Sequence, residues 1–195
     1  MSSTSKLVYA VAFQVGWFVC IMSGSLISSI YAALFLAIHL WYSTKPKHKF
    51  FIYSNLLKKE IFWILTALVL GLLIETISFS GGFLYFKTEA NSHISHKFFE
   101  HFILPPLWLL NLWLIFAIAL RTCLSFLFNN QAITYTLCII FVPFNYYAGA
   151  NLNGTVLINQ PNFISLALIT FLWLLFFACM LKIKQHYFEE TLNAI

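Results

Sequence analysis

Residues Val69–Phe79 read VLGLLIETISF, a hydrophobic run that holds a single carboxylate, Glu75. The whole chain has this character, because 61% of its 195 residues are hydrophobic and only 9% are charged. In a run that crosses a bilayer, an ionised acid near the middle costs roughly 2.5 to 3.5 kcal/mol on insertion scales. The run predicts a transmembrane helix, and Glu75 is the residue in it that points to a function.

The composition is typical of a membrane protein. The chain contains 22 Phe, 9 Tyr and 6 Trp, and its charged residues are too few to give a polar exterior. The net charge of +5 could favour nucleic acid, but the basic residues lie next to apolar runs and are not interleaved with aromatic residues along one face. We therefore expect the lipid bilayer as a partner, and no nucleic acid.

Six apolar stretches are each about long enough for a transmembrane helix, which takes about 17 to 25 residues. They cover residues 7–22, 26–42, 61–79, 104–124, 132–147 and 163–181. The first is similar to a signal peptide, but the second follows it at once, which favours a retained helical hairpin. We expect an all-α fold, a polytopic membrane helix bundle with six transmembrane helices in a single domain over residues 1–195.

One connection, residues 80–103, is long. Its second half carries His93, His96, Glu100 and His101 among several Phe residues, which predicts a short interfacial helix between the third and fourth spans. His93, His96 and Glu100 are three and four residues apart, so they could share a helix face and hold a metal ion. An interfacial helix rich in His, Lys and Phe is nevertheless ordinary, so we predict no metal site and no cofactor.

Lysine and arginine positions predict the orientation of the chain. In a six-span arrangement, nine of the eleven fall on one side of the membrane and only Lys87 and Lys97 on the other. Because basic residues accumulate on the cytoplasmic side, we expect a multi-pass protein with both termini in the cytoplasm.

Polar residues on four of the predicted helices fall at a similar depth. Glu75 lies fourteen residues beyond Ile61, which puts it about 21 Å up a hydrocarbon core of about 30 Å, in the outer half. The same counting brings Gln14 or Trp17, Asn111 and Asn145 to this level. A polar group left unsatisfied in hydrocarbon costs several kcal/mol, so we expect these side chains to face inward.

Two interpretations of this polar level remain open. One is a small pocket in the outer half of the bundle, and the other is a hydrogen-bond network that serves packing at about 0.6 kcal/mol per pair. The candidate ligand-binding residues are Glu75, Gln14, Trp17, Trp108, Asn111, Asn145 and Tyr147. No Ser-His-acid order, nucleophile elbow or intramembrane carboxylate pair is visible, so no catalytic residue is assigned and enzymatic activity has little support.

Four stretches carry a family resemblance: FQVGWFVC at 13–20, GLLIE at 71–75, PLWLLNLW at 106–113 and VPFNYYAGA at 142–150. Their order and spacing resemble the bacterial inner-membrane family called domain of unknown function 2878. The resemblance implies several membrane spans, an inner-membrane location, an acid at the position of Glu75, and no established activity. The chain departs from the family pattern at Phe141-Val142, where Gly-Gly is typical, and in its longer connection with His93, His96 and His101.

From these observations we expect an inner-membrane protein that binds or moves a small or amphiphilic, lipid-related ligand. The alternatives are a membrane enzyme or accessory factor in lipid or fatty-acid modification, which the family's association with that process implies, and a structural partner of other membrane proteins. A substrate-binding subunit of a vitamin transporter stays open by size alone.

Overall fold

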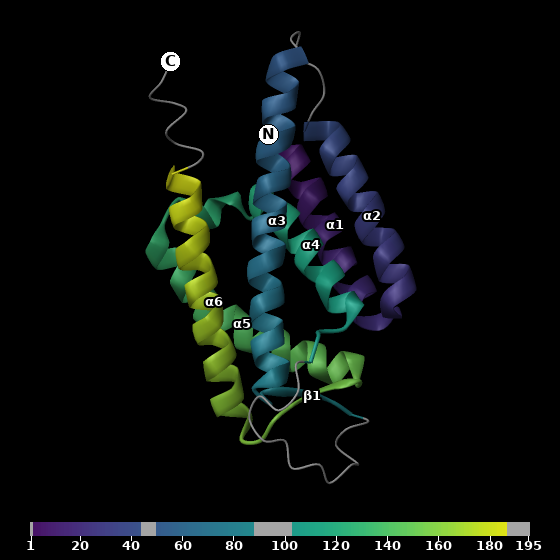
Figure 1. Ribbon diagram of the computed structural model, residues 1–195, viewed down its shortest axis with the longest axis vertical. Helices are drawn as coiled ribbons and strands as arrows, with labels where there is room; N and C mark the ends of the chain where they lie inside the picture. The colour runs from purple at the N-terminus through teal and green to yellow at the C-terminus, as the bar shows by residue number, and fades with distance from the viewer. Residues whose placement is uncertain (1, 44–49, 88–102, 187–195) are drawn as a thin grey trace. The chain divides into compact units, whose positions relative to one another are not determined.

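A computed structural model describes residues 2–43, 50–87 and 103–186. It contains six α-helices (Figure 1): α1 (Ser3–Met22), α2 (Gly24–Ser43), α3 (Phe50–Ser80), α4 (Leu107–Arg121), α5 (Gln131–Asn153) and α6 (Asn162–Lys184). Five of them are long and apolar enough to cross a membrane: α1, α2, α5, α6 and the part of α3 from Leu56 to Ser80. The protein is therefore a membrane protein with a helical bundle fold, as predicted.

The helix ends differ from the predicted spans for local reasons. α3 begins at Phe50, well before Ile61, because Lys58, Lys59 and Glu60 are good helix formers and continue the helix. α4 has only 15 residues, because Pro106 precedes its first turn and the chain leaves the helix at Thr122.

The fifth helix is longer than predicted. α5 begins after Asn130, whose side chain accepts hydrogen bonds from two backbone N–H groups, and it continues through Pro143 to Asn153. It ends where Gly154 takes the left-handed conformation, with φ at 65°. A short 3-10 helix, η2 (Ser125–Phe128), precedes α5.

A two-stranded antiparallel ribbon adds a feature that the sequence analysis did not predict. β1 (Leu84–Phe86) pairs with β2 (Val156–Ile158), with Tyr85 opposite Leu157. The pairing joins the segment after α3 to the connection between α5 and α6. The predicted interfacial helix, with His93, His96, Glu100 and His101, lies outside the described residues apart from its last position, Ile103.

The chain divides into two compact units. Unit 1 comprises Met1–Leu72 and Pro106–Ser125, and unit 2 comprises Leu73–Pro105 and Phe126–Ile195. In unit 1, α4 packs against both α1 and α2, and the Ala117–Leu120 segment of α4 is completely buried. In unit 2, α5 packs against α6, and β2 contacts both helices. The single domain over residues 1–195 stays a prediction.

Unit 1 relies on close helix contacts at two glycines. A Cβ atom added at Gly71 would lie 2.2 Å from Cδ2 of Trp113, and one added at Gly16 would lie 2.6 Å from Cε1 of Tyr31. Both distances are too short for any side chain, so glycine lets the aromatic rings lie directly on the neighbouring backbones.

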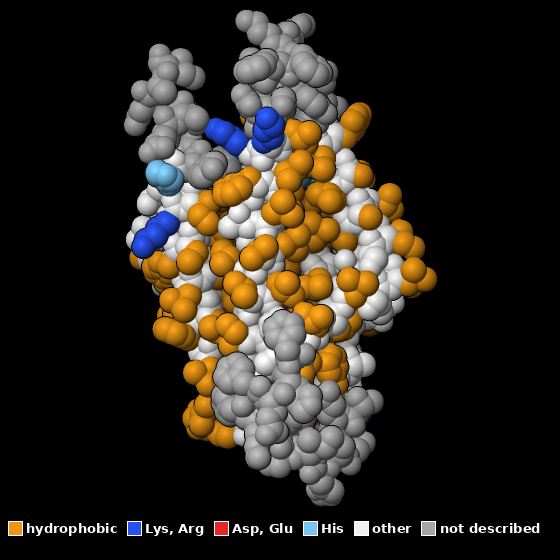
Figure 2. All heavy atoms as spheres, viewed as in Figure 1, with side chains coloured by type: hydrophobic (Ala, Val, Ile, Leu, Met, Phe, Trp, Pro, Cys, Tyr) orange, Lys and Arg blue, Asp and Glu red, His pale blue; other side chains and the backbone are white. Residues whose placement is uncertain are grey.

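Apolar side chains cover much of the outer surface of the helices. Figure 2 shows hydrophobic side chains over much of the visible face, and exposed examples include Leu26, which is 76% exposed, and Phe163, which is 72% exposed. A surface of this kind is unfavourable in water and suits contact with lipid.

Candidate functional sites

The first candidate site lies in unit 2 and is built around Glu75. This residue is only 1% exposed, and its Oε1 accepts a hydrogen bond of 2.5 Å from the hydroxyl of Tyr146. The Tyr146 oxygen in turn accepts a hydrogen bond of 3.1 Å from Nε1 of Trp173. Three helices, α3, α5 and α6, thus each supply one side chain to a continuous polar chain inside an apolar unit.

Helix periodicity brings these three side chains together. On α5, Thr134, Cys138 and Val142 are buried at intervals of four residues, and Tyr146 is the next position of the same stripe. On α6, Trp173 lies four residues after buried Ile169, and its ring is in contact with the rings of Phe176 and Phe177. These stripes bring the two half-buried side chains into contact with each other and with Glu75.

The residue after Glu75 adds a second polar group to this region. Thr76 is 8% exposed, and its hydroxyl oxygen is buried with no hydrogen-bond partner in the described part of the chain. A buried hydroxyl without a partner costs about 1 to 3 kcal/mol. This turn of α3 therefore has hydrogen-bonding capacity that the described protein groups do not use.

Asn145 and Tyr147, two predicted residues of this unit, flank Tyr146 on α5, and both are exposed. Successive residues of a helix are about 100° apart, so only the middle one of the three lies on the buried stripe. The contact to Glu75 is made by Tyr146, which the sequence analysis did not select. Whether Asn145 and Tyr147 bind a ligand stays a prediction.

The remaining predicted residues, Gln14, Trp17, Trp108 and Asn111, belong to unit 1. Gln14 is exposed, Trp17 and Trp108 are half-buried, and the Trp17 ring lies edge-on to Phe18. Asn111 donates hydrogen bonds from Nδ2 to the hydroxyls of Ser28, at 3.0 Å, and Ser29, at 2.9 Å. The structure thus gives Asn111 two partners within its own unit, and the shared polar level across all four helices stays a prediction.

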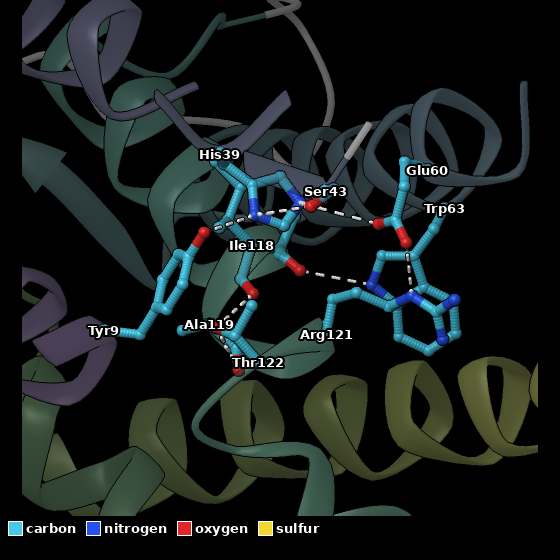
Figure 3. Close-up of polar contacts among 10 residues, drawn as sticks. Tyr9, His39, Ser43, Glu60, Trp63, Ile118, Ala119, Arg121 and Thr122 are labelled. Carbon is cyan, nitrogen blue, oxygen red and sulfur yellow. Dashed lines mark hydrogen bonds and ion pairs between the residues drawn. The ribbon is translucent and has the colours of Figure 1, made fainter. Parts of the chain in front are cut away.

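A second site, in unit 1, was missed by the sequence analysis. We call Tyr9, His39, Glu60 and Arg121 the His39 cluster (Figure 3). Nδ1 of His39 lies 3.1 Å from the Tyr9 hydroxyl, and Nε2 lies 3.5 Å from Oε2 of Glu60. Arg121 donates from Nε to Oε1 of Glu60 at 3.0 Å. The four helices α1, α2, α3 and α4 each supply one member.

The His39 cluster is mostly buried. His39 is 1% exposed and Tyr9 is 8% exposed, while the Glu60 side chain is 12% and the Arg121 side chain 30% exposed. The Arg121 guanidinium also lies 5.9 Å from the ring centre of Trp63, within the range of a cation–π contact. The cluster therefore combines a neutralised ion pair with a buried imidazole.

The sequence holds a pattern that points to this cluster, but the residues on either side of Glu60 and His39 make it hard to recognise. Glu60 follows two lysines and resembles part of a solvated connection, and His39 lies among Ile38, Leu40 and Trp41. However, Ser28, Ala32, Phe35 and His39 recur at helical spacing, and all four are buried on α2. The Ser28 and Ala32 pair is the small-residue spacing typical of membrane helix contacts, and it marks the side that carries His39.

In residues 2–43, 50–87 and 103–186, no three His, Cys or acidic side chains are grouped so that they could hold a metal ion. The two sites offer hydrogen bonding: the Glu75 site by carboxyl, phenol and indole groups, and the His39 cluster by carboxyl, phenol, imidazole and guanidinium groups. The four cysteines are free thiols.

Comparison with known proteins found a match only at the level of a family model. No curated protein and no solved structure matches the chain. The model of the family described as "Protein of unknown function (DUF2878)" matches residues 6–179, which is most of the chain and includes both candidate sites. With six helices, five of them able to span a membrane, and a match of this extent, the chain belongs to the DUF2878 family.

Proposed function

We propose that this membrane protein binds a small or amphiphilic, lipid-related ligand in unit 2, with Glu75 and Tyr146 as its polar contacts. The observation that carries the proposal is the hydrogen-bonded chain from Trp173 through Tyr146 to Glu75, a residue that is only 1% exposed. Ionisable groups inside membrane helices are costly, and they commonly mark sites for ligands, ions or protons.

The Thr76 hydroxyl supports the same region as a binding site. The hydroxyl belongs to the residue that follows Glu75 on α3, and it offers a buried donor and acceptor that the described protein groups leave unused. A ligand with a hydroxyl, amide or carboxyl headgroup and an apolar tail has the matching chemistry. Its polar end would satisfy these groups, and its tail would lie among the apolar helix surfaces.

The proposal also includes the cellular location. The resemblance of the motifs to inner-membrane proteins supports the bacterial inner membrane, and the concentration of Lys and Arg on one side of the six-span arrangement supports cytoplasmic termini. In this orientation Glu75 is in the outer half of the membrane.

The test compares molecules that co-purify with the wild-type protein and with Glu75→Gln, identified by mass spectrometry after extraction from mild detergent. Tyr146→Phe is the second variant, and Tyr135→Phe is its matched control, because it removes the same hydroxyl from a site elsewhere on α5. We expect one lipid-related species to fall about tenfold in Glu75→Gln and Tyr146→Phe, because each change removes a polar contact and tenfold corresponds to about 1.4 kcal/mol, the size of one hydrogen bond.

The Tyr135→Phe protein should retain the species at the wild-type level. Equal recovery from all four proteins would contradict the proposal. If the Glu75→Gln protein retains its fold and instead accumulates an unmodified lipid that the wild type converts, the protein is an enzyme acting on that lipid rather than a binding protein.

A further inference from the structure

Helix α1 packs within unit 1 through one side only. Its buried residues include Tyr9, Gly16 and Cys20, which recur at intervals of seven and four residues and so share one side of the helix. A Cβ atom added at Gly16 would meet the side chains of Tyr31 on α2 and Ile115 on α4. This side of α1 is therefore in contact with the other helices of the unit.

Four exposed residues lie on the opposite side of α1. Two residues of a helix that are two positions apart are rotated by about 200°, so they lie on nearly opposite sides. The four residues stand two positions before and after Tyr9 and two positions before and after Gly16. We call them the α1 outer face: Leu7, Val11, Gln14 and Phe18.

Gln14 is the polar member of the α1 outer face. Eleven residues of α1 precede it and eight follow it, which places it near the middle of a membrane span. No hydrogen bond joins its amide to another residue in the described part of the chain. Leu7, Val11 and Phe18 suit contact with lipid, but an amide left unsatisfied in hydrocarbon is unfavourable. Gln14 therefore needs a hydrogen-bonding partner from outside its own unit.

The Gln14 amide is complementary to a second Gln14 amide, because Nε2 donates and Oε1 accepts. Two copies of one chain have the same orientation in a membrane, since the sequence sets the orientation. A twofold axis along the membrane normal then brings the same residue of both copies to the same depth. Each Gln14 amide can donate to the oxygen of the other.

The rest of the α1 outer face suits the same contact. Its members follow one another at intervals of four, three and four residues, the spacing by which two helices pack side by side along their length. A single polar residue within such a row fixes the register of the two helices. Residues 7–22 contain no charged side chain, so two copies approach without repulsion between like charges.

We propose that the α1 outer face binds a second copy of this chain, in a parallel dimer whose two Gln14 amides are hydrogen-bonded to each other inside the membrane. The self-complementary amide at the centre of the face selects the same protein as the partner. The dimer contact does not depend on ligand binding at Glu75.

The test is energy transfer between full-length proteins that carry donor or acceptor fluorophores on C-terminal tags. They are reconstituted together in vesicles of phosphatidylethanolamine and phosphatidylglycerol at a series of protein-to-lipid ratios. We expect transfer in the wild type to rise with this ratio and to level off, and an excess of unlabelled protein to remove it.

Three variants test the role of the amide. In Gln14→Leu we expect the dissociation constant in the vesicles to rise about tenfold, the effect typical of one polar contact between membrane helices. Gln14→Asn keeps a carboxamide and should associate more tightly than Gln14→Leu. Gln131→Leu is the matched control, because it makes the same change at an exposed position on α5, and it should associate as the wild type does.

Cysteine cross-linking tests the face without changing Gln14. Val11→Cys places a thiol on the α1 outer face, and Leu34→Cys places one on α2 at a residue of similar exposure, 59% against 56% for Val11. Both variants keep the natural cysteines, so the wild type is the blank. Because a disulfide needs Cα atoms within about 7 Å, we expect oxidation in vesicles to increase the covalent dimer in Val11→Cys alone.

A wild-type protein without saturable energy transfer would overturn the proposal and leave the α1 outer face to lipid or to a different protein. Association of Gln14→Leu as tight as that of the wild type would also overturn it. The same holds for equal cross-linking of Val11→Cys and Leu34→Cys. If Gln14→Leu fails to fold, the cross-linking result decides alone.

Discussion

At the residue scale, the two acids of α3 have different surroundings. Glu75 accepts a hydrogen bond from the phenol of Tyr146, whereas Glu60 pairs with Arg121 and lies against the imidazole of His39. A carboxyl held by neutral donors can exchange a partner for a ligand. A carboxyl that pairs with a guanidinium exchanges its partner less readily, because the charge-assisted contact is stronger than a neutral hydrogen bond.

Replacing Arg121 by Gln should destabilise the protein, because the Glu60 carboxylate loses its cation. Breaking a fully buried ion pair costs about 3 to 5 kcal/mol, and we expect about 1 to 3 kcal/mol here because the Arg121 side chain is 30% exposed. The measurement is unfolding in detergent. The double variant Glu60→Gln with Arg121→Gln should recover part of the loss, and strictly additive losses would show that the pair does not couple.

Replacing Gly71 by Ala should force Trp113 out of place, because the new Cβ would lie 2.2 Å from its ring. Overpacking of this kind costs about 1 to 3 kcal/mol, visible as a lower melting temperature in detergent. In a Trp113→Leu background the clash should be absent. Gly71→Ala should therefore lower the melting temperature less there than it does in the wild-type protein. An alanine with no effect in the wild-type background would contradict the close contact.

Individual site residues could be predicted only where the local sequence makes them unusual. Glu75 stands out because its neighbours are apolar. Tyr146 and Tyr147 are adjacent and chemically identical, and a one-residue uncertainty in helix rotation is enough to choose the wrong one. Glu60 follows Lys58 and Lys59 near the expected membrane boundary. Charged residues are common there, and the sequence does not distinguish one that faces water from one that contacts another helix.

At the element scale, the start of α5 depends on one side chain. Asn130 Oδ1 accepts from the backbone N–H groups of Ala132, at 2.9 Å, and Ile133, at 3.3 Å. We expect Asn130→Ala to lower stability by about 1 kcal/mol, while Asn130→Asp keeps the cap. Asn129→Ala, an exposed change one residue earlier, is the control, and an equal loss in both alanine variants would argue against the cap.

The number and type of the helices could be predicted because six long apolar stretches leave few other choices in a bilayer. Their ends could not, because helix formers such as Lys and Glu extend α3 beyond its apolar part and α5 continues past Tyr147 to a glycine cap. The ribbon of β1 and β2 was missed because its two strands have three residues each and are far apart in sequence. Pairing at such a distance leaves no local pattern.

At the scale of the whole molecule, the basic residues predict which side of the membrane each terminus occupies. A green fluorescent protein fused at residue 195 should fluoresce in cells, and alkaline phosphatase fused at the same position should be inactive, because both termini are expected in the cytoplasm. An active phosphatase fusion at the C-terminus would reverse the orientation and move Glu75 to the inner half of the membrane.

The central claim is that the Glu75 and Tyr146 pair holds a ligand inside the membrane. An experimental structure of the wild-type protein, purified in mild detergent with its native lipids, tests this most directly. We predict Glu75 facing the interior of unit 2, with non-protein density within hydrogen-bonding distance of its carboxyl or of the Tyr146 or Thr76 hydroxyl. A Glu75 side chain facing lipid, or a site filled by protein atoms alone, would contradict the claim.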